Sequence, residues 1–149
     1  MMNDIREKIL VRLLAVVGSI EGVRTALRNS IGISDTARPA IIILDADEIA
    51  NSDDPKSRPA NAPRIITMTP EIYIMFGAAA ENVGTEINLL RARLISAILT
   101  DEELINLTAE DKGIRYVGSL NALSLGRSME GQMAVSFDFE YYLKIADLS

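Results

Sequence analysis

The sequence predicts an α+β fold, in which two main α-helices pack on a mainly antiparallel β-sheet in the order α-β-β-β-α-β-β. Three observations carry this prediction. Residues 132–144 alternate apolar with polar side chains, as a strand with one buried face does. Residues 4–17 and 83–99 repeat apolar side chains every three or four positions, as amphipathic helices do. Residues 40–44 are continuously apolar, which favours a strand covered on both faces.

The chain opens with the predicted helix at 4–17. Asp4 suits the N-cap, and Glu7 stands three residues later, as in a capping box. Gly18 is a suitable C-terminal stop. The apolar arc is wide, so we expect burial on two sides, by the sheet and by a second element or a neighbouring subunit. Its main positions are Ile5, Ile9, Leu13 and Val16, widened by Leu10, Leu14 and Val17.

Three strands are predicted between the two helices. Residues 23–28 form a short strand, and Pro39 opens the next strand at a position where the missing N–H costs least. Residues 64–76 resume as strand after a long connection. Because Pro70 lacks a donor for the ladder, it predicts a bulge, a sheet edge or a break into two short strands.

The second half contains the helix at 83–99 and a closing hairpin. Leu89 falls outside the apolar stripe of the helix, either as a single exposed leucine or as part of a second contact surface. Residues 101–107 predict a short extra turn. Residues 114–123 predict a strand with Ile114, Tyr116 and Gly118 on one face, which pairs with 132–144 as a hairpin.

Residues 45–63 predict a long loop, mobile in an isolated subunit, because they lack periodicity and contain three prolines. Hard cations such as Mg²⁺ take carboxylate ligands. The spacing of these acids, however, misses the alternating pattern, central glycine and closing glutamate of a calcium loop. A solvated loop is the simpler interpretation, and a bound cation would bridge subunits weakly. The acids are Asp45, Asp47, Glu48, Asp53 and Asp54.

The composition narrows the function classes. A chain of 149 residues, 48% hydrophobic, predicts one domain spanning 1–149 with a real core. It contains no cysteine and no histidine, which excludes disulfides, thiol catalysis, zinc sites of the usual kinds and Ser–His–Asp triads. The formal net charge of -6 disfavours tight binding to nucleic acid or to an anionic membrane. The glycines form no phosphate-binding loop. The charged N-terminal segment lacks the pattern of a signal peptide, so we expect the chain to fold in a reducing cytoplasm.

Several stretches, taken in order, resemble the tail terminator (minor tail, tail completion) proteins of long-tailed bacteriophages. The resemblance covers most of the chain, and its specificity comes from the order and spacing of stretches that are mainly core patterns. These stretches are IREKILVRLLAVV with GVRTALRN, RPAIIILDADE, PRIITMTPEIYI, VGTEINLLRARLISAIL and GQMAVSFDFEYYL.

This resemblance implies a structural virion protein with no active site and no cofactor. It implies a hexameric ring, built in the host cytoplasm, that caps the tail tube at its head-proximal end and stops tube polymerisation. The partners would be the tail tube protein, a head-completion or connector protein, and DNA that passes through the lumen without specific binding. The residues expected at subunit or partner contacts are Asp47, Asp53, Asp54, Arg58, Leu89 and Arg93.

Two alternatives remain from the sequence. The nearer is another neck, adaptor or tail tube ring protein. The farther is a metal-dependent phosphoryl-transfer or hydrolytic enzyme that uses the acids between Asp45 and Asp54.

Overall fold

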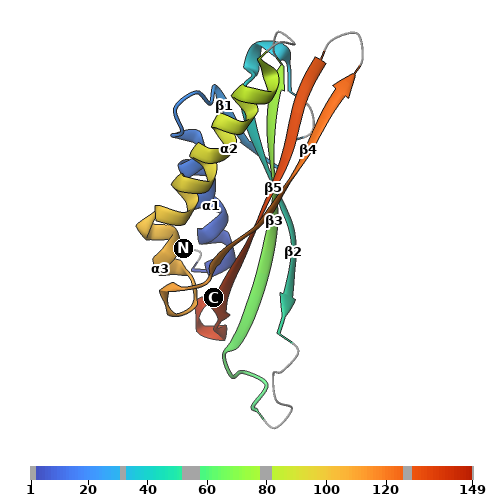
Figure 1. Cartoon of the computed structure of the whole chain (residues 1–149). Coiled ribbons are helices and arrows are strands. Elements are labelled where there is room, and N and C mark those ends of the chain that lie inside the picture. The colour runs from blue at the N-terminus through green and yellow to red at the C-terminus, as the bar shows by residue number, and fades with distance from the viewer. Residues whose placement is uncertain (1–2, 31–32, 52–57, 78–81, 126–128, 149) are drawn as a thin grey trace.

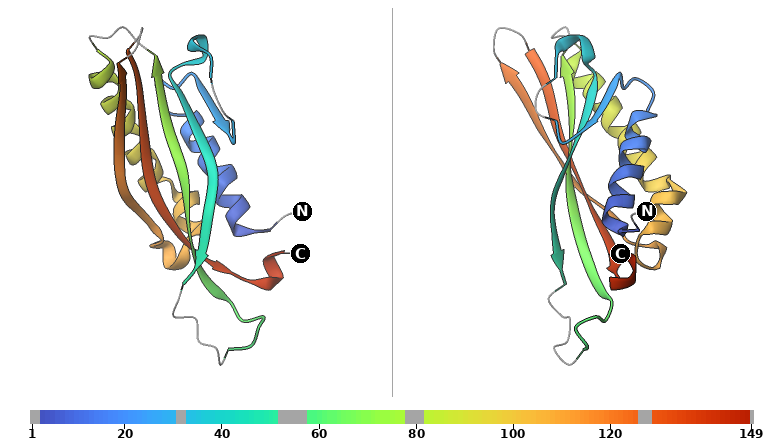
Figure 2. Two further views of the ribbon diagram at one scale, coloured as in Figure 1. Left: turned by 90° about the vertical axis from the view of Figure 1, so that its right-hand side faces the viewer. Right: turned by 180° about the vertical axis from the view of Figure 1, so that it is seen from behind.

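The computed structural model of this protein describes residues 3–30, 33–51, 58–77, 82–125 and 129–148. It is an α+β fold with a mixed, mainly antiparallel sheet of five strands and two main helices, in the predicted order α-β-β-β-α-β-β. The α-helices lie together on one face of the sheet, and no α-helix of the described residues lies on the other face (Figures 1 and 2). The strands are β1 (Thr25–Arg28), β2 (Ala40–Ala50), β3 (Arg64–Gly77), β4 (Ile114–Leu125) and β5 (Met129–Leu143), in the spatial order β1-β2-β3-β5-β4.

Helix α1 (Ile5–Gly18) begins where its capping residue predicts. Asp4 Oδ1 accepts a hydrogen bond from Arg6 N at 3.1 Å, which satisfies one of the free donors of the first turn. The prediction of a capping box is wrong, because the Glu7 carboxylate pairs with Arg28 of β1 instead of turning back to Asp4. The buried residues of α1 include Ile9, Leu10, Leu13, Val16 and Val17.

Helix α2 (Val83–Thr100) buries the predicted stripe against β3, β4 and β5. Asp101 then caps α3 (Glu102–Leu107) by accepting from Leu104 N at 3.0 Å, so the predicted extra turn is confirmed. Helix α1 packs against the sheet and also against α2 and α3, which accounts for the width of its apolar arc. The stripe of α2 comprises Val83, Ile87, Leu90, Leu94 and Ile98.

Strand β5 is the second strand from one edge and pairs along its length with β3 and β4. The alternation that predicted it is confirmed, because its odd-numbered side chains from Met133 to Tyr141 are buried while the even-numbered ones are not. Phe137 is fully buried, with its ring centroid 5.6 Å from that of Tyr116 on β4. Burying one such side chain contributes roughly 1.5–3 kcal/mol.

The predicted loop at 45–63 is wrong over its first part. Strand β2 continues through Asp47 to Ala50 in antiparallel pairing with β3, so only residue 51 and residues 58–63 of that stretch are described as connection. The acidic residues gain strand conformation from the ladder with β3, which is a tertiary effect that local propensity does not report.

Pro70 lies inside the unbroken strand β3, and the bulge it predicted occurs in the neighbouring strand. The register between β2 and β3 shifts between Leu44 and Asp47, so Asp45 and Ala46 together face Pro70. Ala46 has φ 54°, a left-handed conformation that one residue adopts in bulges of the G1 type. Two residues therefore stand where the ladder has one proline.

Candidate functional site

Arg28 joins three elements at the junction of the sheet and the helix layer. From β1 it donates to both oxygens of Glu7 on α1, at 2.8 and 2.9 Å, and to both oxygens of Asp45 on β2, at 2.7 and 2.8 Å. Side-chain hydrogen bonds from Arg28 hold the pKa of Glu7 and the pKa of Asp45 below their usual values. Both carboxylates are therefore ionised at neutral pH and share one guanidinium, so the three side chains together carry one net negative charge.

The bulge of β2 is held by a second arginine. Arg6 Nη2 donates to the Ala46 carbonyl at 2.7 Å, and the N–H of Asp45 donates to Asn29 Oδ1 at 3.0 Å. Two residues after the bulge, the Glu48 carboxylate accepts a hydrogen bond from the hydroxyl of Tyr141 on β5. The pKa of Tyr141 is raised mainly by burial, and further by the hydrogen bond to the Glu48 carboxylate. Asp45 and Glu48 thus stabilise the fold.

The acids of the 45–54 stretch are not gathered into a metal centre in the described part of the chain. No group of three or more His, Cys, Asp or Glu side chains there has the arrangement of a metal site. Asp45 gives both oxygens to Arg28, and Asp53 and Asp54 lie outside the described residues. The metal-dependent enzyme interpretation gains no support from this geometry.

The interface residues predicted on the helix layer lie on α2. The Leu89 side chain is 43% exposed, which fits the prediction that it lies outside the buried stripe. Arg93 Nη1 donates to the Glu21 carbonyl at 2.8 Å, so this guanidinium ties α2 to the turn after α1. Leu89 is thus the more accessible of the two.

The interface residues predicted in the 45–63 stretch lie elsewhere. Asp47 is exposed on β2, and the guanidinium of Arg58 donates to the Pro63 carbonyl at 3.2 Å. Strand β2 and helix α2 belong to different layers of the molecule (Figure 1), so the predicted positions are distributed over two surfaces. The positions 53 and 54 lie outside the described residues.

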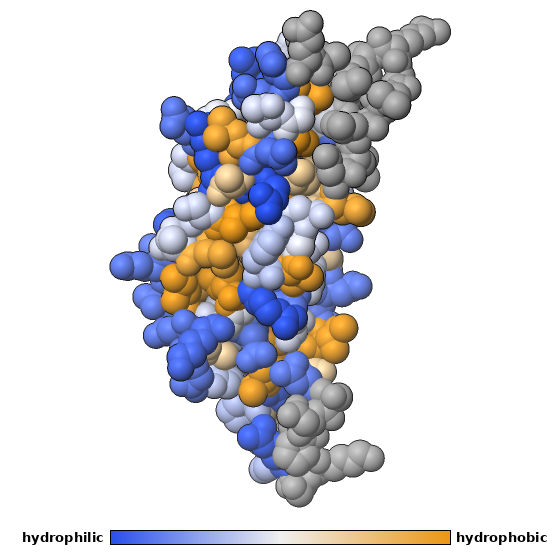
Figure 3. Space-filling view, viewed as in Figure 1, coloured by the Kyte–Doolittle hydropathy of each residue, from blue (hydrophilic) through white to orange (hydrophobic). Residues whose placement is uncertain are grey.

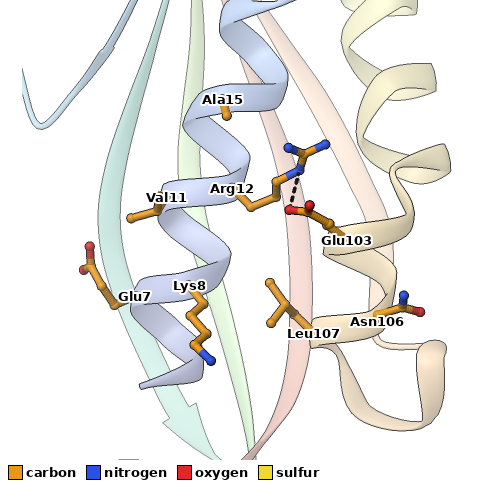
Figure 4. A pocket seen from close by; sticks show the side chains of 8 residues that line it. All are labelled: Glu7, Lys8, Val11, Arg12, Ala15, Glu103, Asn106 and Leu107. Carbon is orange, nitrogen blue, oxygen red and sulfur yellow. Dashed lines mark ion pairs between the residues drawn. The ribbon is translucent and has the colours of Figure 1, made fainter. Parts of the chain in front are cut away.

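A groove of about 660 Å³ lies between α1 and α3, on the outside of the helix layer (Figure 4). Val11 and Leu107 form its apolar wall, and Arg12 pairs with Glu103 across it at 3.3 Å. Apolar side chains are exposed among polar ones on this side of the molecule (Figure 3). The other lining residues are Glu7, Lys8, Ala15 and Asn106. The sequence did not predict this groove, because it depends on how α3 turns back beside α1.

The face of the sheet without helices carries an apolar row that crosses all five strands. Successive partners in the ladders are Leu27, Ile42, Tyr73, Ala134 and Leu120. These residues alternate with the core residues of their strands, which places them on the opposite face. At the β4 edge, Leu120 is 74% exposed, and no described helix covers it. The alternation of side chains within each strand could have identified the residues on this face. Only the strand order and the register show that these five residues lie in one row.

The prediction for β4 needs one correction. Its ladder with β5 shifts between Tyr116 and Gly118, which leaves Val117 as an extra residue. Tyr116 therefore packs in the core while Gly118 pairs with Ser136 on the opposite face. The prediction that Ile114, Tyr116 and Gly118 share one face is wrong for Gly118, because a bulge reverses the alternation.

Searches of protein-family models and of curated proteins found no match to this sequence. In the described part of the chain, no helix combines the length and the apolar character needed to cross a membrane.

Proposed function

We propose that this protein is the subunit of a ring that caps the tail tube of a long-tailed bacteriophage. In this role it ends tube polymerisation and presents the surface to which the head attaches. The ring, a hexamer in the family that the sequence resembles, contacts the tail tube protein on one side and a head-completion or connector protein on the other. It resides at the head-proximal end of the virion tail, after assembly in the host cytoplasm.

The observation that carries this proposal is an open sheet whose two edges differ. Strand β4 forms one edge. Strand β1 and the C-terminal part of β2, which β1 does not cover, form the other edge. Two different edges can join copies head to tail, which is the heterologous contact that closes into a ring. The resemblance along most of the sequence supplies the particular ring. A net charge of -6 suits a conduit through which DNA must pass without sticking.

Native mass and negative-stain imaging of the purified chain test the proposal. The mass is measured over a concentration series from about 1 to 500 μM, with and without Mg²⁺. The expected result is one discrete species whose mass is a small integer multiple of 16.3 kDa, seen as closed rings. Rings added to assembling tail tube protein should stop tubes at a fixed end and cap them.

Two other results would contradict the proposal. Open-ended polymers would favour a tail tube protein, because a terminator stops at a closed ring. A strict monomer at every concentration, with no effect on tube growth, would remove the support for any ring and return attention to the acids at 45–54.

A further inference from the structure

We propose that neighbouring copies of this chain join edge to edge, with residues 114–116 of β4 in one copy pairing antiparallel with residues 46–48 of β2 in the next. In this pairing Arg115 lies directly beside the next copy's Asp47. The inference rests on the proposed ring function and names the contact that builds the ring. The partner it requires is a second copy of this chain.

Neither edge carries a further described strand at this level of the sheet, although the side chains of Asn29 and Arg6 already bond to the backbone of Asp45 and Ala46 on the β2 edge. Strand β1 pairs only with Ala40–Ile43 of β2, so the rest of β2 has no described strand on its outer side. Strand β4 likewise pairs with β5 and has no described partner on its other side. Unpaired edges are templates for strand addition by another chain.

Strand direction favours this junction. The pairs β2·β3, β3·β5 and β5·β4 are each antiparallel, so β4 runs opposite to β2. When identical copies stand side by side in the same orientation, as in a ring, β4 of one copy therefore meets β2 of the next as an antiparallel pair. That arrangement gives the straighter and more stable of the two ladders.

Charge also matches across the junction. One row of the sheet, on the face away from the helices, begins at Asp47 on the β2 edge, continues through Thr69 and Asp138, and ends at Arg115 on the β4 edge. Asp47 is exposed, and Arg115 is 75% exposed although it pairs with Asp138 at 2.6 Å. Continuing the sheet at constant level places the arginine of one copy beside the aspartate of the next. Opposite charges directly across a strand pair stabilise it.

The hydrogen-bond phase of the two edges agrees with the same register. Asn51 N–H donates to the Ile65 carbonyl at 3.1 Å, so 51, 49 and 47 direct their backbone groups toward β3. Glu140 N–H donates to the Gly113 carbonyl at 2.9 Å, so 113 and 115 direct theirs toward β5. Hydrogen-bonded pairs alternate along an antiparallel ladder. Asp47 and Arg115 would therefore meet as a non-hydrogen-bonded pair, flanked by ladder bonds at 48 and at 46, where the neighbour shares the Ala46 carbonyl with Arg6.

The pairing between copies is short because β1 already occupies the outer edge of β2 along its N-terminal part, residues 40–43. The ladder of β1 with β2 ends at Ile43, and the bulge at Val117 bends β4 just beyond Tyr116. Above the bulge, the exposed Val117 and Leu120 would lie against β1 of the neighbour, where apolar contact adds to the three-residue ladder. The two side chains are 53% and 74% exposed, which leaves them available for this contact.

Cysteine cross-linking tests the register directly, since the chain has no cysteine of its own. The Asp47→Cys/Arg115→Cys variant is assembled and then oxidised. Within one copy the two positions lie three strand spacings apart, about 14 Å, which is too far for a disulfide. Between copies, a non-hydrogen-bonded pair places the Cα atoms about 4.5 Å apart, within the disulfide range. The expected result is a ladder of covalent oligomers ending at the ring size.

Matched variants control the cross-linking. Asp47→Cys alone and Arg115→Cys alone should give no ladder, and Asp47→Cys/Ala15→Cys should give none, because Ala15 lines the groove on α1. Melting curves identify any variant that does not fold. If Arg115→Cys does not fold, the assembly of Asp47→Lys alone tests the edge pairing. This substitution should raise the concentration at which half of the chain is assembled by roughly tenfold, while Glu71→Lys, on the same face of β3, should not change it.

The outcomes separate this inference from the proposed function. A ladder in the 47/115 variant together with weakened assembly of Asp47→Lys supports the edge pairing. Wild-type rings with no such ladder, or with assembly unaffected by Asp47→Lys, would overturn the pairing and leave the ring standing. A wild-type chain that never assembles would overturn both.

Discussion

Replacing Arg28 by methionine removes the cation that joins β1, α1 and the bulge of β2. Four hydrogen bonds of 2.7–2.9 Å are lost, and Glu7 and Asp45 are left facing each other. Hydrogen bonds to charged groups contribute roughly 1.5–3 kcal/mol when buried, and exposed pairs contribute about 0–1. The three side chains are 22%, 35% and 28% exposed, so solvent screens them in part.

We therefore expect Arg28→Met to lower the free energy of unfolding by about 2 kcal/mol, between the buried and exposed limits. At about 2–4 °C per kcal/mol for a chain of this length, the melting temperature falls by about 4–8 °C. Denaturant unfolding followed by circular dichroism measures the free energy. Arg24→Met is the matched control. The side chain of this nearby exposed arginine makes one hydrogen bond within the described structure, to the Thr36 carbonyl, so its loss should change stability by less than about 0.5 kcal/mol.

The effect has a defined pH dependence. The pKa values of Glu7 and Asp45 are lowered from 4.5 and 3.8, so their contribution is fully present above those unfolded-state values. It is lost as pH falls through the lower folded-state values. The stability difference between wild type and Arg28→Met should accordingly be constant near pH 7 and close progressively below about pH 5. A difference of the same size at pH 3 and pH 7 would refute the electrostatic account of this cluster.

Further variants test the packing beneath α3. Gly113→Ala should destabilise the fold by roughly 1–3 kcal/mol, because its Cβ would lie 2.3 Å from the Glu140 carbonyl oxygen. Gly84→Ala, where a Cβ meets nothing within 4 Å, should be neutral or stabilising; equal losses in thermal melts would contradict this assignment. Asp101→Ala should cost about 2 kcal/mol, because it removes both the cap of α3 and the ion pair with Arg12 at 2.6 Å. Asp101→Asn should cost less in urea unfolding, since the amide oxygen still caps the helix.

The elements predicted correctly from the sequence are those with a strong local period. Helices α1 and α2 and strand β5 each contain enough turns or alternations to identify a buried face without knowledge of their neighbours. The extension of β2 could not be predicted in this way. Residues 45–50 contain three acids, which disfavour strand structure locally, and their conformation depends on pairing with β3.

The candidate contact surface was predicted only in part for a related reason. Asp47 was identified from its charge, and Leu89 from its position outside a helical stripe, and both are exposed. Arg115 was not identified, because nothing local distinguishes it from other solvated arginines. Its significance comes from standing at the end of a row whose other end is Asp47, and that row exists only once strand order and register are known.

Two bulges at one level of the sheet determine which side chains the edges present. In β2 the extra residue faces Pro70, and in β4 the extra residue follows Tyr116; both Pro70 and Tyr116 lie level with Phe137 of β5. Strict alternation from Ile43 would direct Asp47 toward the helices, and strict alternation from Tyr116 would direct Leu120 into the core. Each bulge reverses the phase of its own strand. The bulges therefore place Asp47 at one edge and Leu120 at the other on the face that the helices leave open. Arg115 precedes the β4 bulge and reaches the same face by simple alternation between Ile114 and Tyr116.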